Sequence, residues 1–154
     1  MPESTFSRGP ILAFDFGLRR IGIAVGQFTT MTAGSLETVS NGKEPDWVAI
    51  DRLVNEWKPA QLLVGLPLGA EGDETEMSRA ARKFGNLLLN RYSLQVNYAD
   101  ERLSSRAAES RFAELRAKGS LRRKHAQKLD AMAAQIILEN WLQSNPGGVL
   151  EEKF

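Results

Sequence analysis

Acidic residues occur at three places in the sequence where the neighbouring apolar residues would not lead one to expect a charge. Asp15 ends one apolar run, and Asp130 lies at the margin of an apolar helical stripe. Between them in the chain, the adjacent acids Asp100 and Glu101 follow another apolar run. Mg²⁺ prefers carboxylate oxygens, and two such ions about 4 Å apart can activate a water against a phosphodiester. These acids therefore predict a divalent-metal site that hydrolyses phosphodiester bonds.

Each acid also has an ordinary structural explanation. Asp15 can be a turn residue of a β-hairpin, and Asp100 can serve a turn in the same way. Glu101 can pair with a nearby arginine. Asp130 can be an acid that the dipole favours near a helix N-terminus. Their joint occurrence beside a basic segment favours the catalytic interpretation.

Positive charge is concentrated in one segment. From position 102 to position 128 the chain holds nine lysines and arginines against two glutamates, although its overall net charge is +1. This asymmetry favours a polyanionic partner such as nucleic acid, and the alternative is a solvated helix face. The basic residues expected to contact nucleic acid flank the acids: Arg19, Arg20, Arg102, Arg106, Arg122, Arg123, Lys124 and Lys128.

A tight β-hairpin is predicted around Asp15. One apolar run ends at this residue, Gly17 provides the turn, and a second apolar run follows. Because side chains alternate along a strand, Gly22, Ala24 and Gly26 share one face of the returning strand. Such a small face predicts the close approach of a helix or of a phosphate backbone.

The remaining pattern predicts an α/β fold, a mixed five-stranded sheet in the order β-β-β-α-β-α-β-α-α with helices on both faces. The run at 61–66 is apolar throughout and predicts a strand buried on both sides. Further strands are predicted at 35–40 and 94–98, and helices at 45–57, 74–92, 105–118 and up to about 143.

Length and composition predict one domain in a chain of 154 residues. We expect the domain at 10–144, between a flexible N-terminal leader at 1–9 and a flexible C-terminal tail at 145–154. The absence of cysteine excludes disulfides, thiolate metal sites and a cysteine nucleophile. No stretch is long and apolar enough for a membrane span or a signal peptide, so a cytoplasmic protein without a membrane partner is expected.

Four segments resemble the YqgF family of bacterial proteins, described as Holliday-junction resolvases and as nucleases that mature the 5′ end of small-subunit ribosomal RNA. The segments are Phe-Asp-Phe-Gly-Leu-Arg-Arg-Ile-Gly-Ile-Ala (14–24), Val-Gly-Leu-Pro-Leu-Gly-Ala-Glu-Gly (64–72), Asp-Glu-Arg-Leu-Ser-Ser (100–105) and Lys-Leu-Asp-Ala-Met-Ala-Ala (128–134). The resemblance implies an RNase H-like fold with the first strand at its centre. It also implies Asp15, Glu101 and Asp130 as catalytic acids, with Asp100 as a further ligand, around one or two Mg²⁺ or Mn²⁺ ions.

The resemblance further implies a function in ribosome biogenesis. The expected activity is 5′-end maturation of pre-16S rRNA, with the precursor and the assembling small ribosomal subunit as partners of a monomer or weak homodimer. Relatives in the wider superfamily place their second acid after the first parallel strand, where this chain has Leu66, Pro67 and Leu68. The second acid must then come from Asp100 or Glu101.

Three alternatives remain at this point. The first is a Holliday junction resolvase in DNA recombination and repair. The second is a nucleic-acid-binding ribosome or transcription factor without catalysis, although converging acids suit phosphate binding poorly unless metal ions intervene. The third is an ATP-binding fold of the actin and Hsp70 type, which needs two such domains where this chain has length for one.

Overall fold

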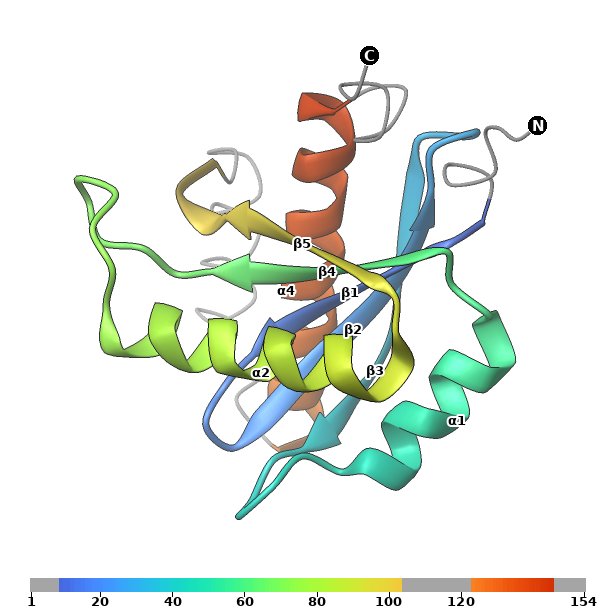
Figure 1. The fold of residues 1–154 in the computed structure, drawn as a ribbon, viewed down its shortest axis with the longest axis horizontal. Helices are drawn as coiled ribbons and strands as arrows, with labels where there is room; N and C mark the ends of the chain where they lie inside the picture. The colour runs from blue at the N-terminus through green and yellow to red at the C-terminus, as the bar shows by residue number, and fades with distance from the viewer. Residues whose placement is uncertain (1–8, 104–122, 146–154) are drawn as a thin grey trace.

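The computed structural model describes residues 9–103 and 123–145 (Figure 1). Its strands are β1 (Ile11–Phe16), β2 (Arg20–Gln27), β3 (Thr32–Ser40), β4 (Gln61–Leu66) and β5 (Gln95–Asp100). Its helices are α1 (Trp47–Trp57), α2 (Glu76–Tyr92), the short 3₁₀ helix η2 (Glu101–Leu103) and α4 (Arg123–Ser144). Across these described stretches, no helix combines the length and apolarity needed to cross a membrane.

The five strands form one mixed sheet in the order β3-β2-β1-β4-β5. Strands β1, β2 and β3 pair antiparallel, whereas β1 with β4 and β4 with β5 pair parallel. Strand β1 therefore lies at the centre, between the hairpin partner and the first parallel neighbour. The predicted mixed five-stranded sheet with an antiparallel start and parallel crossovers is confirmed.

Helices cover both faces of this sheet. Helices α1 and α2 lie on one face, where their apolar sides pack on Leu12 and Phe14 of β1. Helix α4 crosses the opposite face and packs on Ile11 and Ala13 (Figure 1). Strand β4 is buried along its whole length, because it has neighbours on both edges and helices on both faces.

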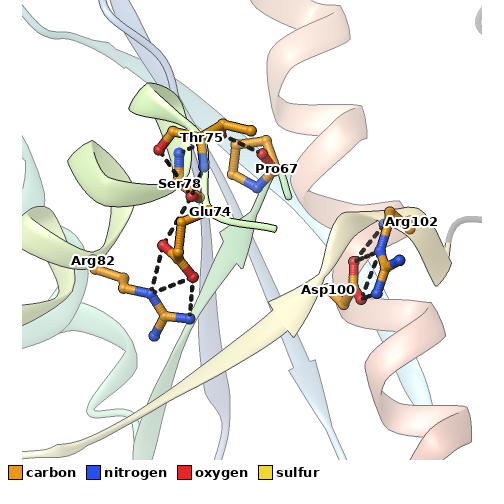
Figure 2. Close-up of polar contacts among 7 residues, drawn as sticks. All are labelled: Pro67, Glu74, Thr75, Ser78, Arg82, Asp100 and Arg102. Carbon is orange, nitrogen blue, oxygen red and sulfur yellow. Dashed lines mark hydrogen bonds and ion pairs between the residues drawn. The ribbon is translucent and has the colours of Figure 1, made fainter. Parts of the chain in front are cut away.

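Helices α1 and α2 each start two residues later than predicted, and local capping explains the shift. Helix α1 begins after Asp46, whose side chain accepts a hydrogen bond from the backbone N–H of Ala49. Helix α2 begins after Thr75, which forms a reciprocal capping box with Ser78 (Figure 2). Capping side chains lie outside the helix that they start, and so both helices begin after the predicted start.

Three other boundaries also differ. Strand β3 starts at Thr32 because its early residues pair with the far end of β2, beyond the predicted 35–40. Strand β5 continues to Asp100, which pairs with Leu66 instead of lying in a loop. The last helix, whose start the sequence did not fix, begins at Arg123, in the basic stretch expected to form a loop or a loose first turn. The helix predicted at 105–118 lies outside the described residues.

Candidate active site

Asp15 lies on the face of β1 that helix α4 covers. Ile11 and Ala13, at alternate positions of the same strand, belong to the apolar cluster under α4. The register pairs Asp15 with Gly22 of β2. Since paired residues of antiparallel strands point to the same face, the carboxylate stands beside a position without a side chain. That space is filled by helix α4.

Helix α4 makes its closest approach to the sheet at Gly22. A methyl group at this glycine would collide with the backbone carbonyl of Asp130. A methyl group at Gly26 would lie 2.8 Å from a methyl carbon of Leu138, two helical turns further on. The prediction that the glycine face of this strand admits a helix is confirmed. The contact brings Asp130 over the strand next to Asp15.

Glu101 reaches the same face from the other side of β1. A methyl group at Gly65 of β4 would lie 2.7 Å from Oε2 of Glu101 and 2.9 Å from the Ile137 side chain of α4. Gly65 pairs with Ala99, which belongs to the cluster under α4. The missing side chain of Gly65 thus makes room for the Glu101 carboxylate. The sequence analysis did not single out this glycine, because it stands inside a continuous apolar run.

Burial and neighbouring negative charge raise the pKa values of two acids on this face. Burial raises the pKa of Asp15 to about 8, and the negative charges of Glu101 and then Asp130 add to the effect. The pKa of Glu101 is raised to about 7, first by burial and then by the charge of Asp100. Largely buried carboxylates that repel one another are typical of sites that receive cations or protons.

Asp100 has a different environment from Glu101. Its strand neighbour Ala99 faces α4, so Asp100 points to the other face of the sheet. There the Arg102 guanidinium binds both carboxylate oxygens of Asp100 at 2.6 to 3.0 Å (Figure 2). The backbone N–H of Arg102 also donates to one of these oxygens, at 2.9 Å. Hydrogen bonds from Arg102 hold the pKa of Asp100 below its ordinary value. Of the two adjacent acids, Glu101 shares the face of Asp15.

Arg102 also fixes the loop between β4 and α2. Its guanidinium donates to the carbonyl of Ala70 at 3.2 Å and lies against Gly72, whose φ of +84° suits a residue without a side chain. The Thr75 hydroxyl donates to the carbonyl of Pro67 and so joins the two ends of the loop (Figure 2). Arg102 is thus engaged in holding the middle of this loop.

Asp130 is held by an arginine from the hairpin. The Nε of Arg20 donates to Oδ2 of Asp130 at 2.6 Å, and both side chains are about one-third exposed. Arg20 was expected to contact nucleic acid, and the structure engages it with an acid of the site. Pairing of this kind fixes the direction of a carboxylate at the open edge of a site. The sequence offered no signal for it, because the two residues are 110 positions apart.

The carboxylates of this site are suitable ligands for a hard divalent cation. Asp15 forms no hydrogen bond or ion pair with any described residue, and the charges around it are carboxylates. Oxygen ligands of this type suit Mg²⁺ or Mn²⁺. In the two described stretches, no three acidic or histidine side chains stand close enough to enclose one ion. The residues present would hold an ion through Asp15 and Glu101, with Asp130 at its edge.

The predicted basic flank is only partly covered by the structure. Arg19 is exposed in the hairpin turn, next to Arg20. Arg106 and Arg122 lie outside the described residues. Three further members, Arg123, Lys124 and Lys128, lie in the first turns of α4.

Comparisons with known proteins identify the family of the chain. The RuvX family model, described as Holliday junction resolvase, matches residues 9–144. A protein of Dechloromonas aromatica with the name "Putative pre-16S rRNA nuclease" is 47% identical over 137 residues, covering 88% of this chain and 92% of that protein. A protein of the same name from Hydrogenovibrio crunogenus is 46% identical over 137 residues, covering 88% and 95%.

Solved structures show the same fold at low sequence identity. RuvC of T. thermophilus in complex with a Holliday junction substrate has a TM-score of 0.51 and 16% identity, covering 89% of this chain and 95% of that chain. The fowlpox virus Holliday junction resolvase has a TM-score of 0.50 and 14% identity, covering 88% and 99%. These neighbours share an RNase H-like architecture with the sheet and helices described above.

Proposed function

Since the chain belongs to the RuvX family of Holliday junction resolvases, we propose that it is a divalent-metal-dependent nuclease that matures the 5′ end of the pre-16S rRNA. Its nuclease activity follows from the family and from relatives that cover nearly the whole chain. The observation that carries the proposal is the grouping of Asp15, Glu101 and Asp130 on one face of the sheet. The burial of Asp15 and Glu101, together with the charge of Asp130 near Asp15, creates a need for positive charge, which a bound cation would satisfy.

The residues of the site would divide the work as follows. A bound Mg²⁺ or Mn²⁺ would activate a water and stabilise the leaving oxygen of the phosphodiester. Asp15 and Glu101 would hold the ion, and both must lose their protons to do so because their pKa values are raised. Arg20 would orient Asp130 at the edge of the site. Asp100 would support the loop through Arg102 and would act on the ion indirectly.

The pre-16S rRNA is the favoured substrate because relatives with more than 40% identity carry that activity in their name. The proposed partners are this precursor and the assembling small ribosomal subunit, and the proposed location is the cytoplasm. The second candidate substrate is the DNA four-way junction, which the family description favours. Junction resolution needs two symmetric cuts and hence a dimer. For the rRNA activity, a monomer or weak homodimer is sufficient.

The test compares two substrates with the same purified protein in Mn²⁺ or Mg²⁺. One is an RNA that carries the unprocessed 5′ leader, and the other is a mobile four-way DNA junction. We expect cleavage of the RNA, its loss in both Asp15→Asn and Asp130→Asn, and retained folding and RNA binding in the variants. Symmetric cleavage of the junction alone would replace the rRNA proposal by the resolvase activity. Tight binding with no cleavage of either substrate would favour a non-catalytic binding protein.

A further inference from the structure

A cavity of about 470 Å³ lies on the side of the hairpin away from helix α4. Its walls come from the turn between β1 and β2, from the segment between β3 and α1, and from one side of helix α2. The volume is in the range of pockets that bind small organic groups. The activity proposed above does not use this cavity.

The apolar part of the lining is exposed to an unusual degree. Leu18 at the hairpin turn is 69% exposed, and Leu87 of α2 is 47% exposed. Phe16 lines the same cavity and packs on Phe84 at a centroid distance of 5.1 Å. Large apolar side chains left in contact with water are a common feature of binding sites. These walls suit the flat face of an aromatic ring such as a nucleobase.

The polar part of the lining carries positive charge and amide groups. Lys43 and Lys83 line the cavity together with Asn41 and Asn86, and no acidic residue of the described stretches does so. Neither lysine forms an ion pair with a described residue. The Asn41 side chain donates to the carbonyl of Gly17 at 2.7 Å, which ties this wall to the hairpin turn. Unpaired ammonium groups beside apolar walls match a nucleotide, with its phosphate and its base.

The cavity has a neighbouring hollow beside Asp130. This second hollow, of about 360 Å³, is lined by Arg19, Arg20 and Asp130, and also by Met77. Leu18, at the tip of the hairpin, lines both hollows. A nucleic-acid strand that passes Asp130 would therefore turn over Leu18 into the larger cavity. On this path it would pass the positive charges of Arg19 and Arg20.

We propose that the larger cavity binds an unpaired nucleobase of the substrate strand close to the cleaved phosphodiester, with the adjacent phosphate at Lys43 and Lys83. The proposal rests on the proposed nuclease function and adds a requirement to it. The strand must be single-stranded where it leaves the active site, because a base inside a duplex cannot enter a cavity. The site would take any base, since stacking on apolar walls is tolerant of sequence.

The test uses Asp15→Asn protein, so that binding is measured without cleavage. The probe is a single-stranded RNA oligonucleotide containing the fluorescent base 2-aminopurine, with the fully paired duplex of the same sequence for comparison. The variants Lys83→Gln and Leu87→Ser are expected to weaken single-strand binding about tenfold each and to leave duplex binding unchanged. They should also reduce the change in 2-aminopurine fluorescence that accompanies base burial.

Two matched controls lie outside the cavity. Leu89→Ser removes a leucine of the same helix that is 46% exposed. Lys58→Asn removes an exposed lysine at a left-handed position, φ 46°, which asparagine tolerates. Both controls should bind the single strand like the parent protein. Equal binding by the cavity variants and the controls would overturn the proposal.

Cleavage assays separate this proposal from the nuclease proposal. If protein with Asp15 intact cleaves RNA, and Leu87→Ser leaves KM and kcat unchanged, the cavity proposal fails and the nuclease proposal stands. If no protein cleaves but Leu87→Ser weakens single-strand binding, base binding in the cavity stands, and the nuclease proposal fails together with the position of that base beside a cleaved bond. If Leu87→Ser changes sedimentation but not RNA binding, the cavity is an interface between two copies, which also overturns the proposal.

Discussion

The Asp15 carboxylate should make the metal-free protein sensitive to pH. Its folded-state pKa of about 8 is above the ordinary value of 3.8, so between these values the folded protein binds more protons than the unfolded chain. Stability should therefore fall as pH rises from about 4 to about 8, by up to about 1.4 kcal/mol per pH unit. Glu101 adds to the same trend up to about pH 7. Thermal unfolding in a chelator at several pH values measures this slope.

Two further measurements identify the source of that slope. Asp15→Asn keeps the size of the side chain and removes its charge, so this variant should unfold at a higher temperature than the parent at pH 8. Added Mg²⁺ should restore the stability of the parent at pH 8 and should do little for the variant. A parent and a variant with equal slopes would show that Asp15 is not the titrating group.

The adjacent acids Asp100 and Glu101 should differ sharply in activity. Glu101→Gln removes a charge from the face of Asp15, and we expect at least a hundredfold loss of cleavage and weaker Mg²⁺ binding. Asp100→Asn removes the partner of Arg102, and we expect a loss of less than tenfold with unchanged Mg²⁺ binding. Cleavage rates and calorimetric metal titrations of both proteins provide the comparison. Equal losses would mean that both acids act on the ion.

At the scale of elements, the contact between β2 and α4 holds the site together. Gly22→Ala would push the α4 backbone away from the strand at Asp130, with an expected cost of about 3 kcal/mol in stability. The displaced helix would also separate Asp130 from Arg20, so cleavage should fall further than stability alone explains. Denaturant unfolding and cleavage at a temperature where the variant remains folded measure the two effects.

Gly34→Ala provides the matched control for this prediction. Gly34 lies in the neighbouring strand β3, and an added methyl group there would meet no atom within 4 Å. The change should alter stability by less than about 1 kcal/mol and leave cleavage intact. If Gly22→Ala behaved like this control, α4 would be free to adjust and would not be fixed by the glycine.

The sequence predicted this packing because its cause is local. Gly22 and Gly26 share a face by simple alternation, and such a small face predicts the close approach of a helix. By contrast, the ion pair of Arg20 with Asp130 joins residues 110 positions apart, and no periodic pattern records such a pair. The place of Glu101 depends on the missing side chain of Gly65 in a neighbouring strand, which also leaves no pattern. Elements were therefore predictable, and the partners of individual charges were not.

For the whole molecule, positive charge should govern how tightly nucleic acid binds. The lysines at the cavity and the arginines of the hairpin supply part of this charge, and the basic stretch from position 102 to 128 supplies more. Each phosphate contact releases counterions, so the affinity for RNA should fall steeply and linearly on a log–log plot against salt. Binding by Asp15→Asn protein at several salt concentrations tests this, and a flat response would exclude a charged docking surface.

The contact of Arg20 with Asp130 has a consequence for biosynthesis. The hairpin with Asp15 is synthesised early. Asp130, the third acid on the face of Asp15, belongs to helix α4 and is synthesised much later. A nascent chain that lacks this helix has no third acid and no partner for Arg20. If Asp130 is catalytic as proposed above, such a chain should not cut RNA while the ribosome is still translating it. We therefore expect truncated translation products that end before Asp130 to be inactive in the RNA cleavage assay.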